Sequence, residues 1–150
     1  MHLLIFVALF SLLSTAATAQ MNIPAPDDVK AAPADAAKTS SGLAHKVVKA
    51  GQGATKPTPA DIVMVNYTTW TPDGKMHDTS YGKGPQFLPV GKLIPAWIEG
   101  LQLMVAGETR RFWAPEAIAY RGRDPKGPIV FEIELLSVQP NSTPATAAPK

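Results

Sequence analysis

The sequence predicts an α+β domain in which one helix packs against an antiparallel β-sheet. Residues 62–70 (IVMVNYTTW) are rich in β-branched and aromatic side chains, as is typical of a strand. Residues 129–138 (IVFEIELLSV) carry apolar side chains on one face and Glu132 and Glu134 on the other. Such alternation indicates a sheet that is open to water on one face and covered by a helix on the other. The helix is predicted by five apolar residues at helical spacing, which are Ile94, Trp97, Ile98, Leu101 and Met104.

The strand over 62–70 is expected to be central, because both of its faces are partly apolar. One face carries Val63, Val65 and Tyr67, and the other carries Ile62, Met64 and Trp70. The sequence TPDG at 71–74 predicts a turn, in which proline presets one backbone dihedral and glycine permits another. Residues 75–80 are then expected to pair back as a hairpin.

The predicted helix begins at Pro95, where the missing N–H of proline costs nothing in the first turn. We expect it to end at the Ala106-Gly107 turn. Residues 109–114 (TRRFWA) then read as a further strand that precedes the one at 129–138.

These patterns occupy residues 42–138, which we interpret as one domain of ordinary size. Residues 20–41 are dominated by Ala, Pro, Asp, Lys and Ser, with few large apolar side chains. They are predicted to form a disordered leader. Residues 139–150 have the same character and are predicted to form a disordered tail.

Residues 1–19 have the character of a cleavable signal peptide. The stretch from Leu3 to Leu13 is apolar apart from Ser11, and it is too short to span a membrane. Small residues from Ala17 to Ala19 favour cleavage after Ala19. The sequence therefore predicts a periplasmic or secreted protein. Because the first residues lack lysine and arginine, an uncleaved membrane anchor is the alternative.

Composition excludes several classes of function. The net charge of +2 arises from 14 basic and 12 acidic residues without runs of either sign, which favours neither nucleic-acid nor polybasic membrane binding. The absence of cysteine excludes disulfides, thiolate catalysis and cysteine zinc sites.

Conventional catalytic motifs are also missing from the sequence. His45 and His77 lack a metal-type spacing, and each has a simpler interpretation as a strand residue. No serine lies in a Gly-x-Ser-x-Gly motif, and Gly51-Gln52-Gly53 lacks the third glycine of a dinucleotide loop. We therefore expect neither a cofactor nor a metal.

Four sequence blocks occur in the order seen in FKBP-type peptidyl-prolyl isomerases. They are VNYTTWTPDGKMHDTS, LIPAWIEGLQLM, GETRRFWAPEAIAY and IVFEIELL, and the resemblance covers essentially all of residues 42–138. It implies a strongly twisted antiparallel sheet of about five strands wrapped around one short helix. It also implies a peptidyl-prolyl cis-trans isomerase whose active site is the apolar hollow between sheet and helix.

The resemblance also implies the site residues, position by position. Trp97 would form the pocket floor, and the Ile94 N–H and the Tyr120 hydroxyl would bind carbonyls that flank the proline. The matching catalytic positions are Tyr67, Asp78, Ile94, Trp97, Tyr120 and Phe131. Further pocket positions are His77, Phe87, Leu88 and Leu93.

Asp78 has two interpretations at this point. It would orient Tyr67 and polarise the rotating carbonyl, or it would form an ion pair with Lys83 that holds the hairpin. A mixture of the two is favoured, because a carboxylate at the rim of an apolar pocket needs a partner in either case.

The implied chemistry needs no nucleophile. Rotation about an X–Pro bond crosses a barrier of about 20 kcal/mol that originates in amide resonance. An apolar pocket disfavours the planar dipolar amide relative to the twisted one. The expected partners are proline-containing peptides, unfolded exported proteins and, weakly, macrolide inhibitors, with the chain itself a monomer that binds no nucleic acid.

Three features depart from the usual pattern of the family. His77 replaces a phenylalanine before the aspartate, which removes an aromatic wall and adds a titratable group. Phe87 is out of register with the usual pocket phenylalanines, so either Phe87 or Leu88 lines the pocket. The loop at 121–128 (RGRDPKGP) is short and basic. His77 and the short loop favour the alternative function, an FKBP-like holdase or peptide-binding module with little turnover.

Overall fold

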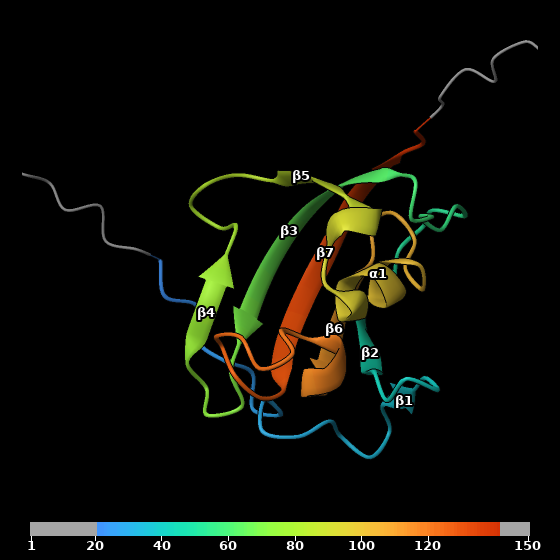
Figure 1. Cartoon of the computed structure of the whole chain (residues 1–150). Helices are drawn as coiled ribbons and strands as arrows, with labels where there is room; N and C mark the ends of the chain where they lie inside the picture. The colour runs from blue at the N-terminus through green and yellow to red at the C-terminus, as the bar shows by residue number, and fades with distance from the viewer. Residues whose placement is uncertain (1–20, 142–150) are drawn as a thin grey trace, which may run out of the picture.

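The computed structural model describes residues 21–141, which form one antiparallel sheet with a short helix packed on its inner face (Figure 1). The seven strands run in the order β1-β2-β6-β7-β3-β4, with β5 also paired to β3. Their bounds are β1 Ala37–Lys38, β2 Ala44–Lys49, β3 Ile62–Trp70, β4 Met76–Thr79, β5 Gln86–Pro89, β6 Thr109–Ala114 and β7 Ile129–Gln139. The helices are α1 Pro95–Leu101 and the 3-10 turns η1 Val90–Lys92 and η2 Glu116–Ile118. The predicted signal peptide and all of the predicted tail beyond residue 141 lie outside the described residues.

The predicted fold class is confirmed, and the core lies between the sheet and α1. The central strands β3 and β7 are paired along their whole length, with Tyr67 opposite Ile133 and Thr69 opposite Phe131. The alternation predicted for β7 is confirmed as well, because Ile129, Phe131, Ile133 and Leu135 are all buried.

The predicted hairpin after β3 is present. Gly74 has a φ of +89°, which glycine adopts without strain, and the Thr71 N–H donates to the Lys75 carbonyl at 2.9 Å. Strand β4 then pairs with β3, and this pairing places Asp78 opposite Thr69.

The structure corrects two predictions about these elements. The sheet has seven strands rather than about five, because the two-residue β1 and the four-residue β5 add to its edges. The helix ends at Leu101, short of the Ala106-Gly107 turn. The Val105 N–H donates to the buried Glu108 carboxylate at 3.3 Å, so it does not continue the helical ladder.

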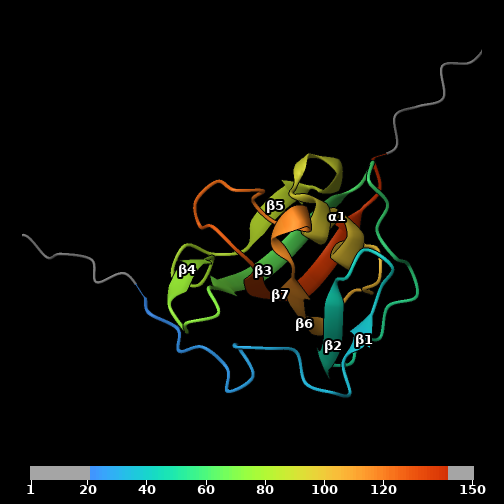
Figure 2. The ribbon, with the colours of Figure 1, turned by 60° about the horizontal axis from the view of Figure 1, so that its bottom comes forward.

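Residues 21–36, here called the strap, correct the prediction of a disordered leader. Figures 1 and 2 show the strap, in blue, running from beside β4 to β1. Trp70 and Trp113 point away from the helix, and each donates its indole N–H to a strap carbonyl at 2.9 Å, that of Ile23 and Asp28 respectively. The strap side chain Val29 is 7% exposed.

An ion pair also anchors the strap. Arg111 on β6 donates to both carboxylate oxygens of Asp28, at 2.8 and 3.1 Å, and to Glu132 at 2.8 Å. The outer face of the sheet is therefore not simply open to water, as its sequence pattern predicted. It carries a second apolar cluster made of Val29, Ala44, Trp70, Trp113 and Val130.

Within residues 21–141, no helix has the length and apolar character that crossing a membrane would require.

Candidate functional site

A hollow of about 190 Å³ opens between the inner face of the sheet and α1. Its lining combines apolar and aromatic side chains with one carboxylate. The lining residues are Tyr67, Thr69, Asp78, Leu88, Leu93, Ile94, Trp97 and Tyr120. The fold thus brings together seven of the ten site residues predicted from the sequence. They come from β3, β4, β5, α1, the residues just before α1 and the residues just after η2.

The floor of the hollow is a stack of aromatic rings. Trp97 meets Tyr67 edge-on at 5.1 Å between ring centroids and stacks on Phe131 at 5.3 Å. Phe131 in turn stacks on Phe112 at 4.9 Å. Phe131 is fully buried and lies outside the lining, so it supports Trp97 from behind instead of facing the hollow.

Gly100 allows α1 to lie close to this stack. A Cβ atom at Gly100 would sit 2.8 Å from the Phe112 ring, closer than van der Waals contact allows. The absence of a side chain there sets the depth of Trp97, which lies one turn earlier on α1.

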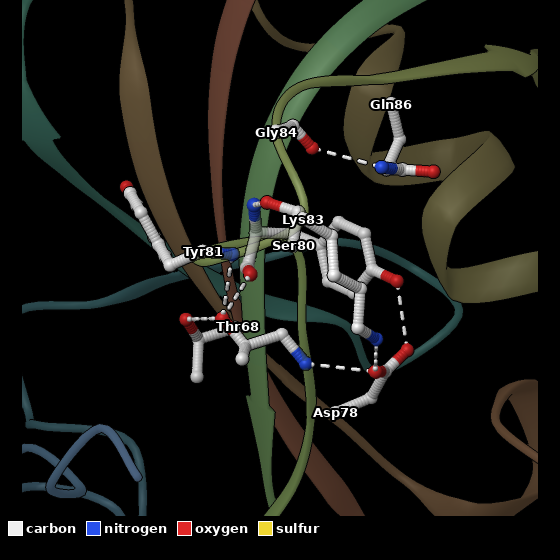
Figure 3. A network of polar contacts seen from close by, with 9 residues as sticks. Thr68, Asp78, Ser80, Tyr81, Lys83, Gly84 and Gln86 are labelled. Atoms are coloured by element: carbon white, nitrogen blue, oxygen red, sulfur yellow. Dashed lines mark hydrogen bonds and ion pairs between the residues drawn. The ribbon is translucent and has the colours of Figure 1, made fainter. Parts of the chain in front are cut away.

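One wall of the hollow is polar and is built by the β3–β4 hairpin. The Tyr67 hydroxyl donates to Asp78 Oδ2 at 2.7 Å, and Lys83 Nζ lies 3.2 Å from Asp78 Oδ1. Figure 3 shows Lys83, in the turn that follows β4, reaching back to Asp78. Ser80 Oγ accepts the Tyr67 N–H at 2.9 Å, which fixes the backbone beneath the ring. Both contacts weighed for Asp78 from the sequence are therefore present together.

These contacts set the protonation of the pair. Burial, and then the hydrogen bond to Asp78, raise the pKa of Tyr67 well above its usual value. Burial alone would raise the pKa of Asp78, but hydrogen bonds from Tyr67 and Lys83 outweigh it and hold that pKa below its ordinary value of 3.8. At neutral pH the tyrosine is a hydrogen-bond donor and the aspartate is a carboxylate.

Two further lining residues carry hydrogen-bond donors. Ile94 precedes α1 in an extended conformation, and its N–H finds no acceptor within residues 21–141. Tyr120 follows η2, and burial followed by the nearby Asp78 charge raises the pKa of its phenol, so the hydroxyl keeps its proton. The two donors can therefore bind carbonyl groups that flank a residue held above Trp97.

The structure resolves the choice between Phe87 and Leu88. On β5, Leu88 lies opposite the fully buried Val63, whereas Phe87 lies opposite Met64. Leu88 therefore lines the hollow, and Phe87 points outward with 58% of its surface exposed. The prediction of Phe87 as a pocket residue is wrong, because successive residues of a strand face opposite sides.

His77 is also outside the lining, which corrects its prediction as a pocket residue. Its exposed ring meets Tyr120 edge-on at 5.8 Å and lines a neighbouring hollow. It therefore supports the pocket only through Tyr120.

Thr69 is a lining residue that the sequence reasoning missed. It lies two residues after Tyr67 on β3 and so shares its face, where it pairs with Asp78 and Phe131. The period of two along the strand would have identified it.

Among residues 21–141, no three His, Asp or Glu side chains lie close enough together to hold a metal ion.

Comparisons with known proteins agree with this architecture. A family model described as FKBP-type peptidyl-prolyl cis-trans isomerase matches residues 53–136. FkpA of Aeromonas hydrophila, named as an FKBP-type peptidyl-prolyl cis-trans isomerase, is 41% identical over 107 residues, which are 67% of this chain and 40% of that protein.

Two solved structures are similar in fold and sequence. The crystal structure of FkpA from Escherichia coli has a TM-score of 0.67 at 34% identity, covering 72% of this chain and 53% of that one. A peptidyl-prolyl cis-trans isomerase from Pseudomonas syringae has a TM-score of 0.66 at 33% identity, covering 72% and 84% of the two chains.

The match to the Aeromonas protein spans less than half of that relative's length. The family match, however, spans more than half of the present chain and contains every residue that lines the hollow. The chain belongs to the FKBP-type peptidyl-prolyl cis-trans isomerase family.

Proposed function

We propose that this chain catalyses cis–trans isomerisation of X–Pro bonds in peptides and in unfolded proteins. The observation that carries the proposal is the hollow itself, in which Trp97 forms an apolar floor between the Tyr67–Asp78 pair and the Ile94 N–H. Family membership and the names of the relatives support the same activity.

The geometry accounts for catalysis without a covalent step. The proline ring would lie against Trp97, with Tyr67 and Leu88 as side walls. The surroundings favour the twisted amide, which has lost its resonance dipole, over the planar one. The Ile94 N–H and the Tyr120 hydroxyl would hold neighbouring carbonyls while the bond turns, so that the peptide does not rotate as a whole.

A protease-coupled assay on a short X–Pro peptide tests this proposal. We expect cis-to-trans conversion clearly faster than the uncatalysed rate, which is on the order of 0.01–0.1 per second. Turnover at background in a protein shown by circular dichroism to be folded would instead support the peptide-binding module. One reason for that alternative is already weaker, because His77 lies outside the pocket lining.

We also propose that the protein is exported and acts as a monomer on unfolded proteins outside the cytoplasm. The character of residues 1–19 supports export, and a relative from Legionella longbeachae that is 42% identical over 106 residues is named an outer membrane protein. Sequencing of the mature protein is expected to give Gln20 as its first residue; recovery of an intact Met1 would contradict cleavage.

Macrolide binding is expected to be weak, since the 121–128 loop is short.

The assignment of β5 predicts opposite results for two adjacent residues. Leu88→Ala should lower kcat/KM about threefold to tenfold, because it removes roughly 1 kcal/mol of apolar contact from the pocket wall. Phe87→Ala is the matched control, and its kcat/KM should stay within about twofold of the wild type. Both are measured in the coupled assay after thermal melts establish folding. The reverse ranking of the two variants would show that β5 has the opposite register.

The pKa of Asp78 predicts the acid limit of activity. A carboxylate with a folded pKa below 3.8 keeps its hydrogen bond to Tyr67 above that pH, and loses it only as the pH falls through the lower folded value. We therefore expect kcat/KM to be constant from about pH 7 to about pH 5 and to fall only below pH 3.8, through the lowered pKa of Asp78. Line-shape NMR of a proline peptide measures this without a protease.

Two carboxylate variants identify the titrating group. Asp78→Asn should lower activity and remove the acid limb of the profile, since the amide does not titrate. Asp35→Asn is the control, because Asp35 also has a lowered pKa but pairs with Lys46, on β2 and away from the hollow. An acid limb that persisted in Asp78→Asn would assign it to another group.

A further inference from the structure

A second hollow lies next to the proposed proline pocket. Its volume is about 230 Å³, and it is lined by Thr71, Lys75, Met76, His77 and Pro125. The first four residues belong to the β3–β4 hairpin, and Pro125 belongs to the loop between η2 and β7. In Figures 1 and 2 this loop, in orange, lies beside β4.

A pair of aromatic rings separates the two hollows. Tyr120 lines the proline pocket, His77 lines the second hollow, and their ring centroids are 5.8 Å apart. An extended peptide advances about 3.3 Å per residue. A peptide that leaves the proline pocket past Tyr120 therefore crosses the 5.8 Å to the His77 ring within about two residues.

The second hollow differs in chemistry from the pocket. The Lys75 ammonium and the His77 imidazole can donate hydrogen bonds, whereas the Thr71 hydroxyl already donates to Asp73. Lys75 makes no ion pair among residues 21–141. A carboxylate suits such a set best, because it carries the charge opposite to that of Lys75 and accepts hydrogen bonds with both of its oxygens.

The charges around the hollow also favour an anion. Residues 71–77 carry Lys75 and Asp73, and residues 121–128 carry three cations, Arg121, Arg123 and Lys126, against Asp124. Four cations thus oppose two carboxylates. Asp73 is already engaged by the Thr71 hydroxyl and the Lys75 N–H.

Arg123 ties this basic loop to the wall between the hollows. Its Nε donates to the Tyr120 carbonyl at 3.3 Å, and its charge opposes the rise in the pKa of the Tyr120 phenol. The positive charge of the loop therefore acts at the rim of the proline pocket and not at a distant surface.

We propose that the second hollow is a substrate subsite that binds an acidic side chain one to three residues from the isomerised proline. The inference rests on the proposed isomerase function and names its preferred substrates, X–Pro segments flanked by Asp or Glu. His77, which departs from the family pattern, and Lys75 are its specificity-determining residues.

Matched peptides test the subsite. Each peptide carries Glu, Gln or Lys at a single position that lies one, two or three residues from the proline, and is otherwise identical. Exchange NMR compares these peptides at low salt and at 0.5 M NaCl. We expect kcat/KM for the best Glu peptide to exceed that of its Gln counterpart about threefold to tenfold at low salt, with Lys lowest, and the difference to shrink at high salt.

Variants of Lys75 test whether the preference for the Glu peptide arises at the second hollow. Lys75→Gln should reduce the Glu-to-Gln ratio towards one, and Lys75→Glu should favour the Lys peptide. Lys49→Gln, on β2 and away from both hollows, is the control that keeps the wild-type ratio. Equal constants for all three peptides, or a preference that survives Lys75→Glu, would overturn the subsite. If the isomerase proposal itself were wrong, the result would be different, because none of the peptides would be turned over, including the neutral Gln peptide.

Discussion

Deletion of residues 21–36 should lower the free energy of unfolding by about 3–5 kcal/mol, since it uncovers roughly 150–200 Å² of apolar surface, most of it on the two outward tryptophans. Trp70 and Trp113 also lose the carbonyls that accept their indole N–H groups. Urea unfolding followed by tryptophan fluorescence compares the chain starting at residue 21 with that starting at residue 37. If the two chains unfolded at the same urea concentration, the strap would contribute nothing to stability.

A point variant tests the strap without truncation. Asp28→Asn weakens the ion pair with Arg111, whose side chain is partly exposed and keeps its bond to Glu132, so we expect a cost of about 1 kcal/mol. Asp27→Asn is the matched control, because Asp27 is exposed and makes no ion pair within the described part of the chain. Equal stability of both variants would contradict the anchoring role of Asp28.

Trp97→Leu should reduce kcat/KM about 10- to 100-fold, because it removes the aromatic floor that holds the proline ring and so about 1.4–2.7 kcal/mol of transition-state binding. Trp97→Phe should retain more activity than Trp97→Leu, since a ring still stacks on Phe131. The coupled assay measures both, at a temperature well below each melting transition.

Trp113→Phe provides the control for loss of a tryptophan. Trp113 is as buried as Trp97 but lies on the outer face beneath the strap, so its replacement should lower stability and leave kcat/KM of the folded protein unchanged. Full activity in Trp97→Leu, or an equal loss in both variants, would show that the proline does not lie above Trp97.

The central elements could be predicted because their side-chain patterns are local. The alternation in β7, the turn at 71–74 and the proline start of α1 each depend on neighbouring residues. The seven lining residues that were predicted came from the resemblance, and Thr69 would have followed from its position on β3.

The missed features depend on contacts between distant segments. Pairing of β5 with β3 sends Leu88 inward and Phe87 outward, and no local pattern sets that register. The strap has few large apolar residues, so its composition indicated disorder. Its order arises because Trp70 and Trp113 present apolar rings and indole N–H groups on the outer face, and polar groups that are buried need partners. The sequence did offer one indication of this cover, because the strand at 62–70 carries apolar residues on both of its faces.

Exchange NMR on a proline peptide tests the central claim most directly, because it observes rotation of the X–Pro bond without a coupling enzyme. With a small fraction of folded protein present, we predict cis–trans exchange cross-peaks on the sub-second timescale, strongly reduced by Trp97→Leu and retained in Phe87→Ala. Exchange no faster than in the free peptide, with the protein folded and the peptide bound, would contradict the account.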